Sequence, residues 1–225
     1  MTIRSASNSK ALIEAASQDF AQLANQLLES KEQIRVLLTG GTLGIEFISQ
    51  LGKLDLDFSR IWLMFSDERF VALDHPDRNE QQGISAWPEL ANHLVRFPGP
   101  EMTLIAARDR AELDLKKLDL EHTTFDLTVL GMGPDAHVAS LFPGHEAEGE
   151  WVIAESNSPK PPSERLSLSY QALSRSERVW FLAAGESKLW AVSQSLRADS
   201  GLPAARVRGI SETVWYLDSE ITDAL

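Results

Sequence analysis

The feature that most constrains the fold is a short apolar strand that runs directly into a glycine-rich turn. Residues 125–143 have the sequence FDLTVLGMGPDAHVASLFP, in which Gly131 and Gly133 interrupt the apolar run. A buried strand followed by a glycine turn is the junction at which α/β proteins place polar groups, at the carboxyl edge of a sheet. The apolar residues 138–142 predict the start of a helix after the turn, and the proline that follows them ends it.

The turn continues with two polar residues, which make it a candidate catalytic site. Asp135 and His137 lie where exposed backbone N–H groups favour anions and oxyanions. A histidine in such a turn can exchange a proton near neutral pH, so His137 is a candidate general base. The alternative is a structural histidine, because glycine turns after strands are common in α/β domains. These residues alone leave both interpretations open.

A second junction of the same kind lies nearer the N-terminus. Residues 34–38, IRVLL, predict a buried strand, and the turn TGGT at 39–42 precedes a helical pattern. Gly40 and Gly41 let the backbone approach a ligand closely, and Thr42 adds a hydroxyl at a helix N-terminus. The turn is neither a P-loop nor a dinucleotide fingerprint, so it does not indicate a nucleotide. A purely structural turn explains these residues about as well.

Charged residues follow a third predicted strand. Residues 61–65, IWLMF, run straight into Asp67, Glu68 and Arg69. Because the carboxyl ends of parallel strands meet at one edge of a sheet, we expect these charges to lie near the two glycine turns. The alternative is an ordinary solvated turn.

The rest of the chain alternates strands with helices. Ser7 or Asn8 is expected to cap the first helix. Further strands are predicted at residues 102–106, 151–154, 165–169, 178–183 and 214–217, and helices at residues 13–27, 111–120 and 188–196. We therefore expect residues 1–225 to form a single α/β domain, in which helices flank a mostly parallel, Rossmann-like sheet.

The composition excludes several classes of partner and site. A formal net charge of −12 argues against nucleic acid or an anionic membrane as a partner. The absence of cysteine excludes disulfides, thiolate metal sites and a cysteine nucleophile. The five histidines show no zinc-type spacing, so the sequence predicts neither a metal nor a cofactor. The chain has no apolar segment typical of a signal peptide or a membrane span, which predicts a cytoplasmic protein.

Several short motifs, taken together and in order, resemble a known family. They are TGGT at 39–42, SDERFV at 66–71, DRN at 77–79, GMGPDAHVASLFPG at 131–144, KPPSERLSLS at 160–169 and GESK at 185–188. Over roughly residues 10–220 this set resembles the 6-phosphogluconolactonases of the glucosamine/galactosamine-6-phosphate isomerase superfamily. The resemblance implies the fold that glucosamine-6-phosphate deaminases share with ribose-5-phosphate isomerases. It also implies hydrolysis of 6-phospho-D-glucono-1,5-lactone to 6-phospho-D-gluconate, a step of the oxidative pentose phosphate pathway, without a cofactor.

The resemblance also suggests roles for individual residues. His137 matches the proposed general base of the family, Asp135 matches the aspartate of the same turn, and Arg69 matches the arginine beside the reacting carbonyl. The residues expected to bind substrate are Gly40, Gly41, Thr42, Asp67, Asn79, Arg165 and Lys188.

Three positions depart from the family pattern. Ala136 stands where the family has a glycine, Val138 where it has a threonine, and Arg78 where it has a serine. One reason for a glycine is a backbone with positive φ. We expect Ala136 instead to have an ordinary negative φ, with the glycine of the family favoured for close packing. Val138 removes a hydroxyl from the neighbourhood of the site.

Two other functions are compatible with a chain of this kind. A glucosamine-6-phosphate isomerase or deaminase would carry an Asn-Glu-Pro segment after its histidine, where this chain has Leu141, Phe142 and Pro143. A non-catalytic sugar-phosphate sensor would be joined to a DNA-binding segment, and this acidic chain has no basic helix-turn-helix pattern. Both differences favour the lactonase. The partner expected is a small molecule, and the protein is expected to be a monomer or a weak homodimer.

Overall fold

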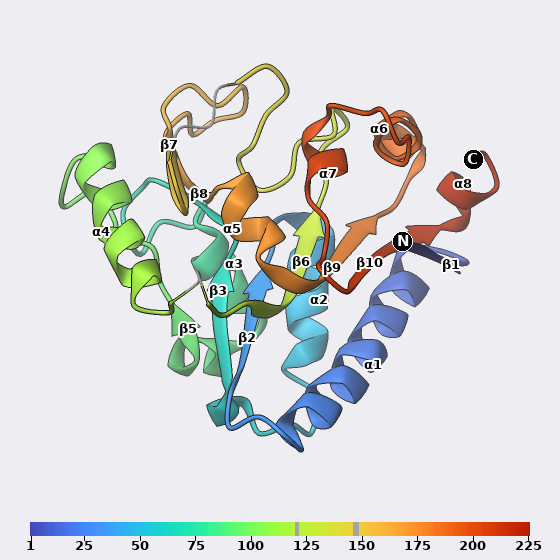
Figure 1. The fold of residues 1–225 in the computed structure, drawn as a ribbon, viewed down its shortest axis with the longest axis horizontal. Helices are drawn as coiled ribbons and strands as arrows, with labels where there is room; N and C mark the ends of the chain where they lie inside the picture. The colour runs from blue at the N-terminus through green and yellow to red at the C-terminus, as the bar shows by residue number, and fades with distance from the viewer. Residues whose placement is uncertain (120–121, 146–148) are drawn as a thin grey trace.

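The computed structural model describes residues 1–119, 122–145 and 149–225, and within these ranges two sheets form the framework (Figure 1). The strands of the larger sheet are β1 (Thr2–Ala6), β2 (Ile34–Leu38), β3 (Ile61–Phe65), β5 (Leu94–Val95), β6 (Phe125–Gly131), β9 (Ser176–Ala183) and β10 (Glu212–Asp218). They lie in the order β1-β10-β9-β6-β2-β3-β5, and neighbouring strands pair in parallel. The smaller sheet is antiparallel, in the order β4-β8-β7, and consists of β4 (Asp67–Arg69), β7 (Val152–Glu155) and β8 (Arg165–Leu168).

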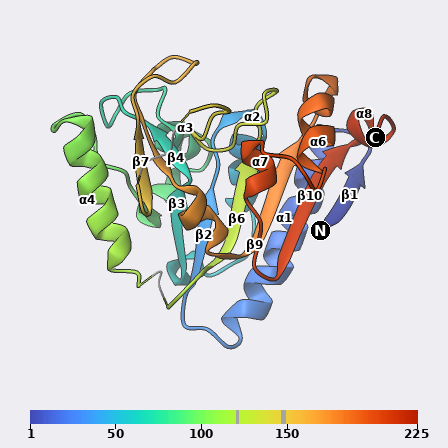
Figure 2. The same ribbon diagram turned by 45° about the horizontal axis from the view of Figure 1, so that its top comes forward.

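Helices cover both faces of the parallel sheet. The α-helices are α1 (Ser9–Leu28), α2 (Gly41–Leu51), α3 (Asn79–Ala86), α4 (Leu104–Lys116), α5 (Tyr170–Ser174), α6 (Leu189–Ser195), α7 (Pro203–Arg206) and α8 (Ser219–Thr222). Short 3₁₀ turns are η1 (Phe58–Arg60), η2 (Pro88–Asn92) and η3 (Glu186–Lys188). In Figure 2 the smaller sheet lies beside α4, at the end of the molecule opposite to the two termini.

The alternation of side chains along each strand builds a core on each face of the parallel sheet. Val36 and Leu38 of β2 pack into one core with α1 and α2, whereas Leu37 packs into the other core. The second core also holds the buried faces of α4, α6 and the smaller sheet. Because both faces are covered, the central strands β2, β3 and β6 are buried along most of their length, as parallel strands usually are. The predicted fold class is confirmed.

The prediction of a strand at residues 102–106 was wrong. Thr103 caps helix α4 there, because its hydroxyl accepts a hydrogen bond from the backbone N–H of Ala106 at 3.2 Å. Leu104, Ala107 and Ala111 then repeat at helical spacing and are buried. These two signals, the cap and the period of three to four residues, outweigh the apolar character of the segment. Helix α4 ends at Lys116, and the predicted helix end at residue 120 lies outside the described residues.

Two further predictions need correction at the level of secondary structure. Residues 138–142 do not form a helical turn: Val138 and Leu141 make an isolated β-bridge, and Ala139 has a positive φ of 49°. Val138 is fully buried in the core, which accounts for an apolar residue in place of a hydroxyl. The chain also begins with a strand, β1, rather than with helix α1, which Asn8 caps as expected. β1 is an exposed edge strand without an apolar face, so its sequence carries little strand signal.

Among the described residues, no helix is both long enough and apolar enough to cross a membrane.

The expectation that Ala136 has a negative φ was also wrong. Its φ is 65°, in the left-handed region. The turn that contains it is closed by two backbone bonds, from the N–H of Ala136 to the carbonyl of Gly133 at 3.0 Å and from the N–H of Gly133 to the carbonyl of His137 at 2.9 Å. A chain reversal this tight needs a left-handed residue before the strand direction resumes. The protein therefore holds an alanine where a glycine is conformationally preferred.

Replacement of this alanine should stabilise the protein. A residue other than glycine in the left-handed region costs roughly 1–2 kcal/mol of stability, which its replacement by glycine recovers. Part of this gain is offset by the flexibility of glycine in the unfolded chain. We expect Ala136→Gly to raise the free energy of unfolding, measured in urea, by roughly 0.5–1 kcal/mol. The matched control is Ala107→Gly, an equally buried alanine inside helix α4, which should lower it by about 1 kcal/mol. Equal destabilisation by both substitutions would contradict the assignment of strain to Ala136.

Candidate active site

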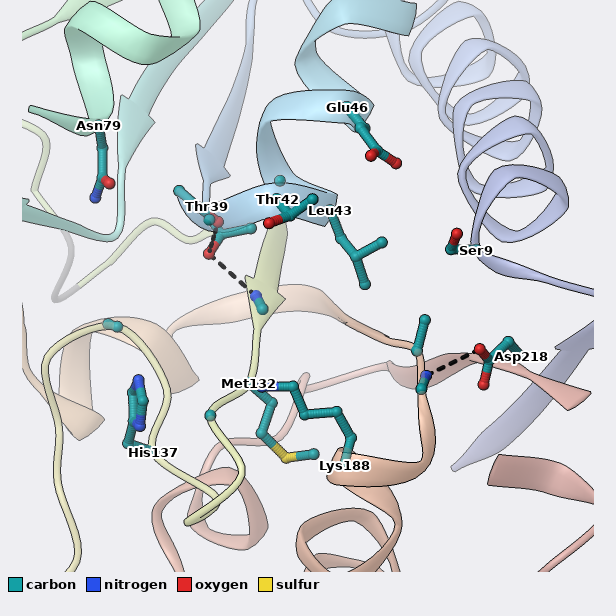
Figure 3. A pocket seen from close by; sticks show the side chains of 18 of the residues that line it. Ser9, Thr39, Thr42, Leu43, Glu46, Asn79, Met132, His137, Lys188 and Asp218 are labelled. Atoms are coloured by element: carbon teal, nitrogen blue, oxygen red, sulfur yellow. Dashed lines mark hydrogen bonds between the residues drawn. The ribbon is translucent and has the colours of Figure 1, made fainter. Parts of the chain in front are cut away.

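A cavity of about 700 Å³ opens at the carboxyl ends of β2, β6, β9 and β10, where the parallel sheet delivers its loops (Figure 3). The predicted site residues that line it are Gly40, Gly41, Thr42, Asp67, Arg69, Asn79, His137, Arg165 and Lys188. Asp135, the remaining predicted residue, contacts His137. The structure therefore brings together residues that are up to 148 positions apart, from Gly40 to Lys188 (188 − 40).

His137 and Asp135 form a hydrogen-bonded pair at the edge of the cavity. The distance from His137 Nδ1 to Asp135 Oδ1 is 2.5 Å, and the His137 ring packs against Phe142 with ring centroids 4.8 Å apart. The side chain of His137 is 15% exposed. Burial lowers the pKa of His137 below its ordinary value, although the neighbouring Asp135 opposes this effect. Burial acts to raise the pKa of Asp135, but the hydrogen bond with His137, the charge of His137 and the backbone hydrogen bonds together lower it.

The protonation pattern follows from these two directions. An ionised Asp135 can only accept a hydrogen bond, so the neutral imidazole carries its proton on Nδ1 and donates it to the carboxylate. Nε2 of His137 then keeps a free lone pair. A histidine held in this tautomer near neutral pH is suited to take a proton from a substrate or from water.

Gly133 makes room for this pair. A Cβ atom at Gly133 would lie 2.0 Å from both Nδ1 and Cε1 of His137, and 2.4 Å from Oδ1 of Asp135. Real Cβ contacts are never this short, so a side chain here would displace the imidazole ring. The glycine that the sequence shows as a turn former is required because the ring packs directly on the backbone.

The two glycines of the turn after β2 are needed for different reasons. A Cβ atom at Gly40 would lie 2.0 Å from Oδ1 of Asn79, so Gly40 is needed for the packing of Asn79. Gly41 has a positive φ of 75° and open space beside it, so its backbone is open to close approach by a ligand. Thr39 joins the two turns, because its hydroxyl accepts a hydrogen bond from the N–H of Gly131 at 3.0 Å, drawn as a dashed line in Figure 3.

The charged segment after β3 is the buried strand β4 and not a solvated turn. Asp67 is 6% exposed and accepts a hydrogen bond from the hydroxyl of Ser140 at 2.6 Å. Asn79 donates from its side chain to the carbonyl of Asp67 at 2.8 Å. Asp67 thus links the turn that carries His137 to the start of helix α3.

Glu68 has a structural role that the sequence did not reveal. It is 1% exposed and accepts hydrogen bonds from the backbone N–H groups of Arg69, Asn79 and Glu80, at 2.7, 2.7 and 2.9 Å. Burial and, to a smaller extent, the nearby charge of Glu80 raise the pKa of Glu68 to about 7, although Arg78 and the backbone hydrogen bonds oppose them. The carboxyl group fixes the backbone of two residues that line the cavity.

Arg78, one of the departures from the family pattern, is buried beside these carboxylates. It is fully buried, lies 3.0 Å from an oxygen of Glu80 and 3.6 Å from an oxygen of Glu68, and donates to the carbonyl of Phe97 at 2.9 Å. A buried charge is tolerated when it is paired and hydrogen-bonded, which is the case here. Arg78 therefore pairs with the carboxylates next to the start of helix α3 and does not line the cavity.

The two arginines of the cavity are largely engaged by the protein itself. Arg69 donates from Nη1 to the carbonyl of Asp77, and its Nε is buried without a hydrogen-bond partner among the described residues. Arg165 donates to the carbonyls of Pro162 at 3.2 Å and Lys160 at 3.0 Å. The motif KPPSERL also places Lys160 in the cavity wall. The sequence alone did not identify Lys160 as a site residue.

The opposite side of the cavity is acidic. Glu46, Asp218 and Glu220 line it, and Asp218 accepts a hydrogen bond from the N–H of Gly185 at 2.9 Å. In Figure 3 Glu46 and Asp218 lie on the side away from His137. The cavity thus has a cationic side near His137 and an anionic side near the start of α1, which would orient a charged substrate.

The fold and the site together define an α/β protein with a histidine–aspartate pair and a cavity with one cationic side, at the carboxyl edge of a parallel sheet. Residues 7–215 match the family described as glucosamine-6-phosphate isomerases/6-phosphogluconolactonase, and the chain belongs to this family.

Proteins named 6-phosphogluconolactonase are similar to this chain over most of its length. The chain is 32% identical to the 6-phosphogluconolactonase of Mycobacterium leprae, over 95% of this chain and 94% of that one. It is 36% identical to the 6-phosphogluconolactonase of Streptomyces coelicolor, over 87% of this chain and 84% of that one. The crystal structure of the 6-phosphogluconolactonase from Thermotoga maritima superposes with a TM-score of 0.86 at 28% identity, over 97% of this chain and 99% of that one. The family predicted from the motifs is confirmed.

The packing of the His137 ring on Gly133 can be tested without an activity assay. We expect the His137 imidazole to titrate below the ordinary histidine pKa of about 6.5 in an NMR titration, because the ring is buried. In Gly133→Ala the displaced ring should gain exposure, and its pKa should move towards the ordinary value. Gly201→Ala, where an added Cβ would meet open space, should leave the titration unchanged. An unaltered His137 titration in a folded Gly133→Ala protein would contradict the packing described.

Proposed function

We propose that this chain hydrolyses 6-phospho-D-glucono-1,5-lactone to 6-phospho-D-gluconate, in the oxidative pentose phosphate pathway. The observation that carries the proposal is the His137–Asp135 pair, which shares one cavity with the ammonium group of Lys188. Hydrolysis of a lactone that carries a phosphate at its far end requires a base that deprotonates water and a cation that binds the phosphate dianion. The names of the relatives support the same reaction.

In this reaction His137 acts as the general base. Nε2 accepts a proton from water while the water oxygen attacks the lactone carbonyl, and Asp135 stabilises the imidazolium that forms. The tetrahedral intermediate then collapses with cleavage of the bond to the ring oxygen, which takes the proton from His137. The product carboxylic acid ionises in solution. The reaction adds one water across the ester bond and needs no other reactant.

Arg69 is suited to stabilise the oxyanion of the intermediate. Its side chain lines the cavity, and its guanidinium is held by the carbonyl of Asp77. A fixed donor in a site with little water is more effective than a mobile one, because it does not have to reorganise when charge develops. We propose that Asn79 and Asp67 support the sugar hydroxyls beside it.

We assign the phosphate group of the substrate to the part of the cavity that is lined by Lys188 and the start of α2. Lys188 lines the cavity, and Gly41 and Thr42 lie at the N-terminus of helix α2, where backbone N–H groups favour an anion. Since the whole chain carries a formal net charge of −12, a dianion is held by these local donors and not by the overall field.

Other activities of the family use the same fold. The segment after His137 is apolar and buried at Leu141 and Phe142, and it lacks the Asn-Glu-Pro segment expected of a deaminase. The two activities separate in direct assays, because the lactonase releases acid from fresh lactone and a deaminase releases ammonia from glucosamine 6-phosphate. A sensor would bind sugar phosphate and give neither product. Action in the cytoplasm as a monomer or weak homodimer, without a cofactor, remains a prediction from the sequence.

The catalytic role of His137 leads to a clear kinetic prediction. Because the base acts in the transition state, His137→Asn should lower kcat by about 10²–10⁴-fold and leave KM nearly unchanged. In the unmodified enzyme kcat/KM should fall as the pH drops below about 6.5, since His137 must be neutral and its pKa is lowered. Spontaneous lactone hydrolysis is subtracted in each measurement.

The matched control is His122→Asn, which changes an exposed histidine away from the cavity and should leave both constants unchanged. Asp135→Asn should lower kcat in the same direction as His137→Asn, because the imidazole loses the acceptor that holds its tautomer. If His137→Asn kept a near-normal kcat, His137 would be a structural residue.

A further inference from the structure

Helix α3 begins beside the cavity, and a carboxylate from another element caps it. Arg78 occupies the N-cap position, but its side chain makes no capping hydrogen bond within the described part of the chain. Glu68 of β4 instead accepts hydrogen bonds from the backbone N–H groups of Asn79 and Glu80, at 2.7 and 2.9 Å. The same carboxylate accepts a bond from the N–H of Arg69 at 2.7 Å. Glu68 therefore sets the backbone of two residues that line the cavity, Arg69 and Asn79.

This carboxylate needs a counter-charge, and Arg78 supplies it. Glu68 and Glu80 are 1% and 0% exposed, so that two carboxyl groups share one buried cluster. Nε of Arg78 lies 3.6 Å from Glu68, and its Nη2 lies 3.0 Å from Glu80, which Arg96 also reaches at 3.1 Å. Buried carboxylates are costly unless a cation pairs with them. A serine, which the family pattern has in place of Arg78, carries no charge.

Arg78 also closes the segment 71–78 between β4 and α3. Its Nη1 donates to the carbonyl of Val71 at 3.2 Å, at the other end of the segment, and its Nη2 donates to the carbonyl of Phe97 at 2.9 Å. Asp77 lies within this segment, and its carbonyl accepts a hydrogen bond from the guanidinium of Arg69. The buried guanidinium of Arg78 thus supports Arg69 twice, at its backbone through the capping carboxylate and at its side chain through the closed segment.

We propose that Arg78 is a positioning residue for the hydrolysis: it balances the charge of Glu68 and closes the segment 71–78, and it thereby holds Arg69 and Asn79 in place in the cavity. Arg78 is fully buried and is not among the residues that line the cavity, so the substrate does not contact it. The inference rests on the proposed function for the identity of the reaction. It gives a departure from the family pattern a part in that reaction.

The first test is kinetic. Arg78→Lys keeps the charge but loses the planar group that reaches three acceptors at once. It should lower kcat for 6-phosphogluconolactone by about 10–100-fold, because Arg69 loses its fixed position beside the reacting carbonyl. KM should change by less than about threefold, since Lys188 and the start of α2 keep their places. An unchanged kcat in folded Arg78→Lys would overturn the inference.

The matched control is Arg60→Lys. Arg60 also ties backbone carbonyls together, those of Leu28, Lys31 and Glu32 at 2.9, 2.7 and 3.0 Å, but it lies outside the cavity. This variant should lower the Tm and leave kcat unchanged. If Arg60→Lys and Arg78→Lys lowered kcat equally, the loss would reflect general destabilisation and the inference would be wrong.

Coupling shows whether Arg78 acts through Arg69. In a protein that already carries Arg69→Met, the addition of Arg78→Lys should lower kcat by less than about threefold, because the guanidinium that it positions is gone. The full 10–100-fold loss in this background would overturn the inference. Should Arg78→Lys fail to fold, Glu80→Gln takes its place. It removes the charge that holds Nη2 of Arg78 but keeps the shape of the side chain, and it should lower kcat in the same direction.

Hydrogen exchange separates this inference from the proposed function, because it needs no substrate. The amides of Arg69 and Asn79 both donate to Glu68, so both should be protected in the unmodified protein. Arg78→Lys should speed their exchange by about tenfold or more relative to amides of the parallel sheet, whereas Arg60→Lys should not. Faster exchange in a protein that fails to hydrolyse the lactone would refute the proposed function and leave the positioning of Arg69 and Asn79 by Arg78 intact. Unchanged exchange of both amides in folded Arg78→Lys overturns the inference.

Discussion

The parallel pairing of β2, β6 and β9 is the constraint on which the site depends. Because neighbouring strands run in the same direction, the turns that follow them meet at one edge of the sheet. Thr39 fixes the turn after β2 to the turn after β6 through the N–H of Gly131, and Lys188 follows β9 on the same edge. Helices on both faces bury the strands, so this edge is where polar backbone groups remain available for a ligand.

The smaller antiparallel sheet completes the site by bringing in charges that the parallel sheet does not supply. Arg69 of β4 and Arg165 of β8 pair across this sheet, next to the loop that carries Lys160. The buried carboxyl groups of Asp67 and Glu68 bind this sheet to the His137 turn and to helix α3. A strongly acidic chain can therefore present a cavity with a cationic side, since the buried carboxylate of Glu68 holds the backbone of Arg69 in place.

Local signals explain why much of this arrangement was predictable from the sequence. Apolar runs that end in Gly40 or Gly131 mark strands and turns, and they indicate the sheet edge where His137 lies. The left-handed backbone of Ala136 was not predictable, because the closed turn and not the residue type sets its φ. The role of Glu68 depends on hydrogen bonds from β4 to the start of α3. Short motifs contain no information about such contacts.

The central claim is that one molecule is held by His137 at its reacting carbon and by Lys188 and the start of α2 at its phosphate. The crystal structure of the protein with 6-phosphogluconate tests this claim most directly, because the product carries both groups. We predict that the carboxylate lies within hydrogen-bond distance of Nε2 of His137 and near Arg69, while the phosphate contacts the ammonium group of Lys188 and the backbone at Gly41 and Thr42. A phosphate bound beside His137, with the carboxylate at Lys188 or in solvent, would contradict the account.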